Sequence, residues 1–396
     1  MADKFPATFV DEKTGDIRKF RTTWDKVEDS LPDVAHYGLL AAKISLLAPL
    51  IGGALVAAPA AVALWWGTRT AMKKSMDSVH DGLLQQHRQG EFSEYDLTKE
   101  EDRKAFDARF GDLQPQFADD YLKMAKLAHL EQVPKLMVIE PYFREQGRSR
   151  FAGMISDFMA AATSRPNGKD PVVLLGRGAM KELTPEEMRA VVGHELTHVK
   201  LKHMTETANW LGRLSMSGVI NAGLLGAALL GGLPILPVLG LIAVTNVIGT
   251  CLKSMQSRKH EKLCDRGAAI LTGGTKDLSS ALGKIRSAMI KIKQMEVDEE
   301  FRARGMDPPK VREVGGMTRF INATHPPNEQ REKLLNNFEN TYPEFCKKQR
   351  GLFAAAFNKA AKPKTQKPLF APKPKPKPKE PKIKYLKPIN WGFGYR

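Results

Sequence analysis

Two histidines and a glutamate lie close together in the segment His194-Glu195-Leu196-Thr197-His198. Histidines four residues apart lie one turn from each other on one face of a helix, so both imidazoles can reach a single ion. The intervening Glu195 is offset toward the open position, where a catalytic metal site holds water. The spacing therefore indicates a zinc site that activates water.

A zinc ion that activates water needs a third protein ligand, and residues 257–265 offer one. In this segment Glu261 and Asp265 share one helical face. We expect Glu261 to complete the ligand set and Asp265 to accept a hydrogen bond from a ligand imidazole. Taken alone, the segment is also compatible with an ordinary charged helix.

The residues before the first histidine predict where its helix begins. Thr184 is a capping residue, Pro185 suits the first helical position, and Glu187 follows the cap by three residues. We expect a helix that starts at Leu183 or Thr184 and continues into the histidine motif.

Two long uncharged blocks predict how the ligand helices are brought together. Residues 44–68 could form a helix of about 37 Å, enough to span a bilayer, although its prolines and glycines also allow a shallow hairpin. Residues 214–252 are interrupted by glycines and prolines near the middle, which predicts a transmembrane helical hairpin, with a pair of buried core helices or a re-entrant loop as the alternatives. The ends of such a hairpin return to one side, carrying both ligand segments to the same membrane face.

The flanking charges predict orientation. Lysines and arginines follow the first block and border both ends of the second, so the positive-inside rule puts the middle of the chain in the cytoplasm. The N-terminal segment is rich in acidic residues and does not resemble a cleavable signal.

Between the two blocks the pattern predicts helix, then sheet, then helix. Polar helical stretches are expected over residues 81–109 and 117–130, and strands over residues 135–140 and 172–175. We divide the chain into the following parts: a polar segment at 1–43, a membrane segment at 44–68, a first peptidase part at 69–213, a hairpin at 214–252, a second peptidase part at 253–350 and a disordered Lys/Pro-rich tail at 359–396.

Charge and cysteine content restrict the partners. The formal net charge is +17, but the tail alone holds eleven lysines and one arginine against one acid, so no specific nucleic-acid binding is expected of the folded part. Three widely spaced cysteines argue against a disulfide framework. The tail is expected to be solvated, and contact with anionic lipid or with a protein partner are further roles open to it.

Over about residues 120–335 the sequence resembles the integral-membrane zinc metalloproteases of the HtpX heat-shock protease and CAAX prenyl protease family, within the gluzincins. Three ordered motifs carry the resemblance: Leu183-Thr184-Pro185-Glu186-Glu187 leading into Gly193-His194-Glu195-Leu196-Thr197-His198, then Ser257-Arg258-x-x-Glu261-x-x-Cys264-Asp265, then Thr324-His325-Pro326-Pro327 with Arg331. The resemblance implies an α+β, mainly helical, zincin-like metalloprotease domain with transmembrane helices.

The resemblance also implies a role for each motif residue. By the resemblance, His194, His198 and Glu261 would bind one Zn²⁺ per chain, and Glu195 would be the general base. Asp265 would be the carboxylate that orients a ligand. His325 would stabilise the transition state, supported by Arg331.

The sequence departs from the family pattern at two places. Cys264 stands where the family usually has alanine, and we interpret it as a small buried side chain rather than a group that approaches the metal. The substrate-pairing segment appears as Ser156-Asp157-Phe158 if Phe158 is the matching aromatic residue. Two further histidines are not expected to be ligands. His203, five residues past His198, is predicted to point well away from the ligand face, as a structural or solvent-facing residue, and His260 is rotated from Glu261 by one helical step.

These observations predict a membrane-anchored zinc endopeptidase that hydrolyses polypeptide substrates, with Glu195 as the base. By the resemblance, it would act on damaged or unassembled membrane proteins at the cytoplasmic face of a bacterial inner membrane, with an organelle membrane as the alternative location. The alternative from another class is an inactive, protease-like membrane scaffold that recruits partners through its basic tail. The intact ligand set and Glu195 favour the enzyme.

Overall fold

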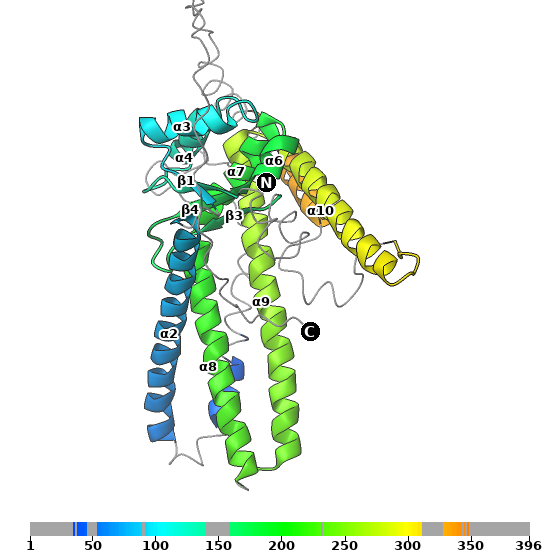
Figure 1. Ribbon diagram of the computed structural model, residues 1–396. Coiled ribbons are helices and arrows are strands. Elements are labelled where there is room, and N and C mark those ends of the chain that lie inside the picture. Colours follow the sequence, from blue (N-terminus) through cyan, green and yellow to red (C-terminus); the bar gives the residue numbers. More distant parts are fainter. Residues whose placement is uncertain are drawn as a thin grey trace, which may run out of the picture.

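The computed structural model describes residues 38–45, 54–88, 92–139, 158–230, 233–310 and 328–341, with the single positions 35, 344 and 347. A domain built around a small sheet lies at one end, and three long helices extend from it side by side (Figure 1). The tail at 359–396 and most of the segment at 1–43 lie outside the described residues.

The sheet has four strands in the order β1-β2-β4-β3. They are β1 (Phe92–Tyr95), β2 (Lys135–Ile139), β3 (Ala160–Thr163) and β4 (Val172–Gly176). The central pair, β2 and β4, is parallel with Lys135 opposite Val172, whereas both outer pairs are antiparallel. The strands predicted over 135–140 and 172–175 are thus present.

One expected helical stretch is wrong. Residues 81–109 contain the end of α2 (Ala54–Arg88), the strand β1, and α3 (Glu100–Phe110). Phe92 and Tyr95 are buried in the sheet, so pairing with β2 overrides the helical pattern there. The second helical stretch is confirmed as α4 (Phe117–Leu127).

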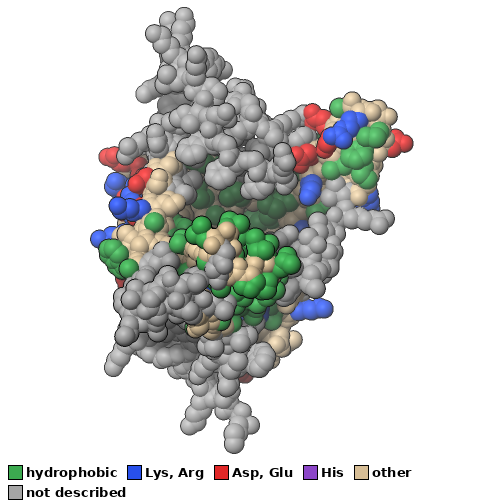
Figure 2. All heavy atoms as spheres, turned by 90° about the horizontal axis from the view of Figure 1, so that it is seen from below, with side chains coloured by type: hydrophobic (Ala, Val, Ile, Leu, Met, Phe, Trp, Pro, Cys, Tyr) green, Lys and Arg blue, Asp and Glu red, His purple; other side chains and the backbone are tan. Residues whose placement is uncertain are grey.

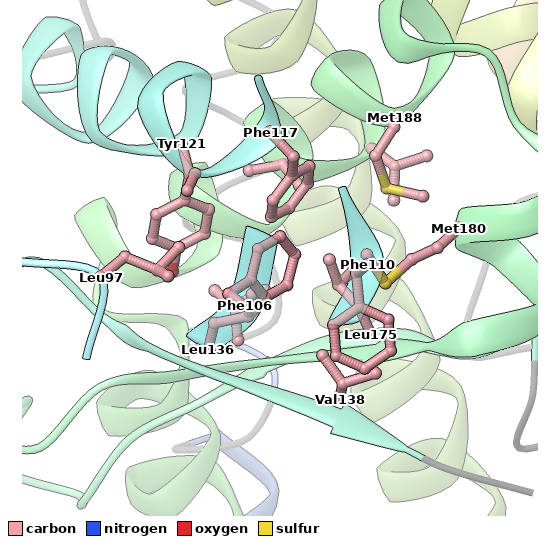
Figure 3. Packing of buried hydrophobic residues seen from close by; sticks show 14 of the residues in the cluster. Leu97, Phe106, Phe110, Phe117, Tyr121, Leu136, Val138, Leu175, Met180 and Met188 are labelled. Carbon is pink, nitrogen blue, oxygen red and sulfur yellow. The ribbon is translucent and has the colours of Figure 1, made fainter. Parts of the chain in front are cut away.

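An aromatic core fixes the sheet against the helices (Figure 3). Phe106 and Phe117 stack with ring centroids 5.3 Å apart. These rings pack with fully buried side chains of the sheet and of the following helices, which include Leu136, Val138, Leu175, Met180 and Met188. Because Met180 lies on α6 (Arg177–Glu182) and Met188 on α7 (Pro185–Lys200), this core holds the histidine helix in place.

The histidine helix begins as predicted. The Thr184 side chain accepts a hydrogen bond from the Glu187 backbone N–H, and the Glu187 carboxylate accepts one from the Thr184 N–H at 2.8 Å. Glu187 also accepts hydrogen bonds from Ser280 and Lys284 of α10 (Lys276–Ala303), which ties the start of α7 to a helix nearly one hundred residues later.

The predicted hairpin corresponds to two helices, α8 (His203–Leu229) and α9 (Ile235–Thr272). They pack against each other, and α8 also packs against α2. The first apolar block is not one separate helix: α2 begins at Ala54 and continues twenty residues beyond Thr68.

Among the described helices, α9 is the one long and apolar enough to cross a membrane. In the most apolar stretch of α9, 22% of the residues are buried within the described structure. Exposed apolar side chains gather at the far end of the hairpin, seen end-on in Figure 2; they include Leu229, Leu230, Leu236 and Leu239. The predicted spans in α2 and α8 remain predictions.

Candidate active site

The candidate site lies where α7 and α9 cross at the base of the hairpin. Gly267 lets the two helices approach closely, because a Cβ at this position would clash with the Thr197 side chain. Thr197 cannot easily give way, since it is buried and its hydroxyl donates to the Gly193 carbonyl at 2.7 Å. This contact directs Glu261 and Asp265, earlier on α9, toward the histidines of α7.

The structure brings the three predicted ligands together. His194 Nε2 lies 3.1 Å from His198 Nε2, and each of these nitrogens lies 3.5 Å from an oxygen of Glu261. Ligand atoms about 2.0–2.1 Å from a tetrahedral zinc ion are about 3.3 Å from one another. The donor set therefore fits one zinc ion by type, number and spacing.

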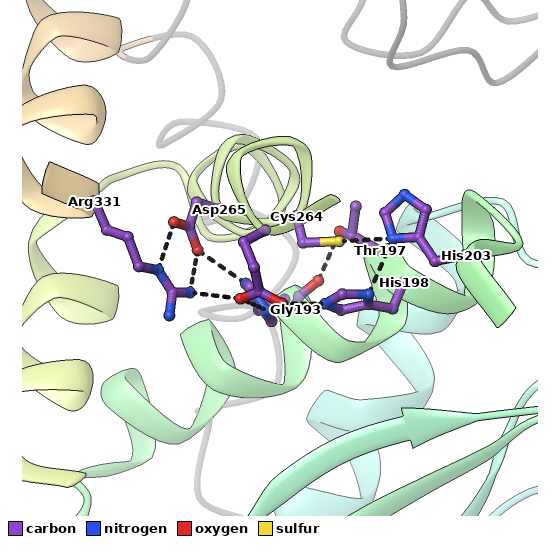
Figure 4. A network of polar contacts seen from close by, with 9 residues as sticks. Gly193, Thr197, His198, His203, Cys264, Asp265 and Arg331 are labelled. Atoms are coloured by element: carbon purple, nitrogen blue, oxygen red, sulfur yellow. Dashed lines mark hydrogen bonds and ion pairs between the residues drawn. The ribbon is translucent and has the colours of Figure 1, made fainter. Parts of the chain in front are cut away.

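Asp265 and Arg331 support this set from the side opposite His198 (Figure 4). Asp265 Oδ1 lies 3.0 Å from His194 Nδ1, the ring nitrogen that does not face the other ligands. Arg331, on α12 (Asn328–Thr341), donates to both oxygens of Asp265, one bond being 2.8 Å, and its Nη2 lies 3.5 Å from Glu261. Arg331 thus contacts the carboxylates; His325, which it was expected to support, lies outside the described residues.

The carboxylates of Asp265 and Glu261 give the site a negative charge that a cation would compensate. Burial lowers the pKa of His194, but hydrogen bonds and attraction from Asp265 and Glu261 outweigh it and raise the pKa to about 10. A proton on His194 and a metal ion are two ways to compensate these carboxylates. Glu195, the predicted base, is buried beside His194 on α7.

The expectation that His203 points away from the ligand face is wrong. It was expected to point away because five further residues on one helix turn a side chain well off the ligand face. In fact α7 ends at Lys200, and Lys202 adopts a left-handed conformation with φ 54°, so that α8 begins in a new direction. His203 is buried, and its Nδ1 lies 3.0 Å from His198 Nδ1.

Cys264 and His260 lie beside His203. The Cys264 thiol is buried, as expected, with its sulfur 3.5 Å from His203 Nδ1. His260 stacks on the His203 ring and its Nε2 lies 2.7 Å from a Glu206 oxygen. Neither residue belongs to the group formed by His194, His198 and Glu261.

The expected substrate strand is partly described. Phe158 lies two residues before the start of β3, whereas Ser156 and Asp157 lie outside the described residues. β3 pairs with β4 on one side and packs near α7, so it borders the site. Its alanine-rich sequence carries no strand signal, which explains why it was not predicted.

Comparison with known proteins identifies this constellation. Residues 156–339 match the model of peptidase family M48. This segment is similar to M48 peptidase domains. The matched segment includes all the candidate site residues, from His194 to Arg331, and agrees with the resemblance inferred from the three motifs.

Individual relatives agree with the domain match. The chain is 35% identical over 196 residues to a protease HtpX homolog of Moorella thermoacetica. The aligned segment covers 47% of this chain and 64% of the relative. It is 34% identical to one of Streptomyces coelicolor, with 63% of the relative covered, and 32% identical to one of Methanosarcina acetivorans, also with 63% covered. The match thus spans somewhat less than two thirds of each of these relatives. No solved structure matches the chain significantly.

Proposed function

We propose that this protein is a membrane-anchored zinc endopeptidase that hydrolyses peptide bonds of polypeptide substrates. The observation that carries the proposal is the spacing of the His194, His198 and Glu261 donor atoms, 3.1–3.5 Å, in a buried site of the M48-like domain. These residues would hold one zinc ion. When bound, zinc supplies Lewis acidity, which eases deprotonation of water and polarises a carbonyl.

The proton transfers fall to Glu195. Its carboxylate takes a proton from the attacking water, whose oxygen forms a bond to the scissile carbonyl carbon. The carbon–nitrogen bond then breaks, and Glu195 returns the proton to the leaving amine. Asp265 accepts a hydrogen bond from His194 Nδ1–H and so keeps Nε2 free for the metal. We assign oxyanion stabilisation to His325 from the family resemblance, and to Arg331 the role of holding Asp265.

The exposed apolar helices support a membrane location. The hairpin end is apolar, whereas Arg69, Lys73 and Lys74 lie toward the domain end of α2. We propose that the M48-like domain faces the cytoplasm, in a bacterial inner membrane, and acts on damaged or unassembled membrane proteins. The basic tail is proposed to contact anionic lipid or a protein partner.

Zinc content and hydrolysis test the enzyme proposal together. Elemental analysis of the full chain, purified in detergent without chelator, should give about one zinc per chain. His194→Ala should lose the metal. Glu195→Gln should keep it but cleave unfolded casein at least about 100-fold more slowly. A wild-type chain that takes up no zinc, or an active Glu195→Gln variant, would favour the inactive scaffold or a different base.

A further inference from the structure

His203 lies against the candidate metal site without belonging to its ligand set. It is 4% exposed, and its Nδ1 lies 3.0 Å from His198 Nδ1. His198 Nε2 is the nitrogen that faces His194 and Glu261, so His203 contacts the other nitrogen of the same ring. This contact is visible as a dashed line in Figure 4.

The proposed metal binding decides which nitrogen of His198 carries the proton. A neutral imidazole that binds a metal through Nε2 carries its proton on Nδ1, and this N–H needs an acceptor. Two nitrogens 3.0 Å apart are joined by a hydrogen bond when one donates and the other accepts. We propose that His203 is a positioning residue: its Nδ1 accepts the hydrogen bond from His198 Nδ1–H and holds His198 Nε2 toward the metal.

The inference rests on the proposed zinc site. It gives each of the two histidine ligands a hydrogen-bond partner at Nδ1. His194 has a carboxylate partner, Asp265, at its Nδ1, and the proposal gives His198 a neutral imidazole in the same place. Glu195, Glu261 and Asp265 are already buried around the site. A neutral acceptor orients His198 without adding a fourth buried negative charge.

His203 could instead be a ligand of a second metal ion, together with Glu206 and His260, whose ligand atoms lie near one another. The ring geometry argues against this. The His203 and His260 rings are stacked, with centroids 3.9 Å apart and planes at 7°. A metal lies in the plane of each imidazole that binds it, and two nearly parallel, separated planes have no common point near both nitrogens. The stack instead sets the plane of the His203 ring, and Glu206 holds His260 at 2.7 Å.

Chain geometry explains how His203 reaches this position. The left-handed Lys202 ends the turn after α7, and His203 is the first residue of α8. The acceptor for His198 therefore comes from the start of the first hairpin helix, whereas the third ligand comes from the end of the second.

Zinc affinity of matched variants tests the proposal. The full chain is stripped of metal in detergent, and zinc is titrated against a chromogenic chelator. His203→Phe keeps a ring that can stack on His260 but has no acceptor. His203→Asn places a polar atom where Nδ1 was, whereas His203→Gln places it where Nε2 was. We expect His203→Phe and His203→Gln to weaken zinc binding by about 10- to 100-fold and His203→Asn to stay within about threefold of wild type.

Each outcome of the zinc titrations either supports or overturns the proposed role of His203. Equal affinity of wild type, His203→Phe and His203→Gln would overturn the proposal, and so would equal weakening of all three variants, which indicates packing alone. If His203→Phe fails to fold, the contrast between His203→Asn and His203→Gln carries the test. His260→Phe keeps the stacked ring and should bind zinc like wild type; a loss as large as that of His203→Phe would assign the effect to the His260 contacts. A wild-type chain that does not bind zinc would overturn the proposed function as well. The titration of the wild-type chain separates this outcome from failure of the His203 proposal alone.

Discussion

At the scale of single residues, Asp265 links Arg331 to His194 without belonging to the candidate ligand group. It receives two hydrogen bonds from Arg331 and lies 3.0 Å from His194 Nδ1. We expect Asp265→Asn to lower zinc affinity by about 10- to 100-fold, because an amide neither attracts the imidazole N–H as strongly nor pairs with Arg331. Chelator competition measures the change. Asp298→Asn on α10, far from the site, is the control, and equal affinities for the two variants would contradict the role of Asp265.

A second residue-scale prediction concerns His194 in the metal-free protein. Its pKa is raised from 6.5 to about 10, so the folded state binds a proton that the unfolded state loses. Such a group stabilises the fold below about pH 6.5, and this stabilisation disappears as the pH rises through about 10. Urea unfolding of the metal-free chain should therefore show a free energy of unfolding that falls between pH 7 and pH 10. His194→Gln should flatten this dependence; an unchanged slope would assign it to other groups.

Residue types and spacing predicted which side chains lie together at the candidate site. His194, His198, Glu261 and Asp265 come together as the motif spacing implied, because each pair lies on one helical face. His203 was misplaced because no local signal marks the left-handed Lys202, a residue without the usual glycine preference for that conformation. Histidines just beyond such a motif are worth testing as partners of the second ligand.

At the scale of elements, the close crossing of α7 and α9 decides whether the ligands meet. Gly267→Ala would push a methyl group into Thr197, and we expect a loss of about 1–3 kcal/mol in the free energy of unfolding together with weaker zinc binding. Gly283→Ala on α10 meets open space and should be neutral or slightly stabilising, since alanine favours helix. Thermal unfolding of both variants measures the difference. A Gly267→Ala chain as stable as Gly283→Ala would show that the helices can separate freely.

Element prediction succeeded where a local signal agreed with the tertiary structure. The Thr184 cap and the strands β2 and β4 were predicted from capping residues and apolar runs. β1 and β3 were not, because their strand conformation comes from pairing with β2 and β4 rather than from their own residues. The two edge strands, β1 and β3, were therefore the part of the fold that could not be predicted from the sequence alone.

At the scale of the whole molecule, the exposed apolar surface of α9 predicts membrane insertion. Val244 and Val247, each 57% exposed, lie near the middle of its apolar stretch. Replacing both by lysine should cost about 2.5–3.5 kcal/mol for each residue at the centre of a span. Flotation with phospholipid vesicles should then show much less bound protein. Ile290→Lys on α10 is the matched control and should float like wild type; flotation of the double variant at wild-type levels would refute insertion of α9.

One continuous helix, α9, joins the apolar stretch to the ligand Glu261 without an intervening loop. From Leu252 to Glu261 the rise is only about 13 Å. A rigid rod adapts to bilayer thickness by tilting, and a tilt at one end displaces the other. Given the proposed insertion of α9 and the proposed zinc site, we expect bilayers of unequal thickness to set different separations between Glu261 and the α7 histidines. The same polypeptide would then have a different hydrolytic rate in each bilayer.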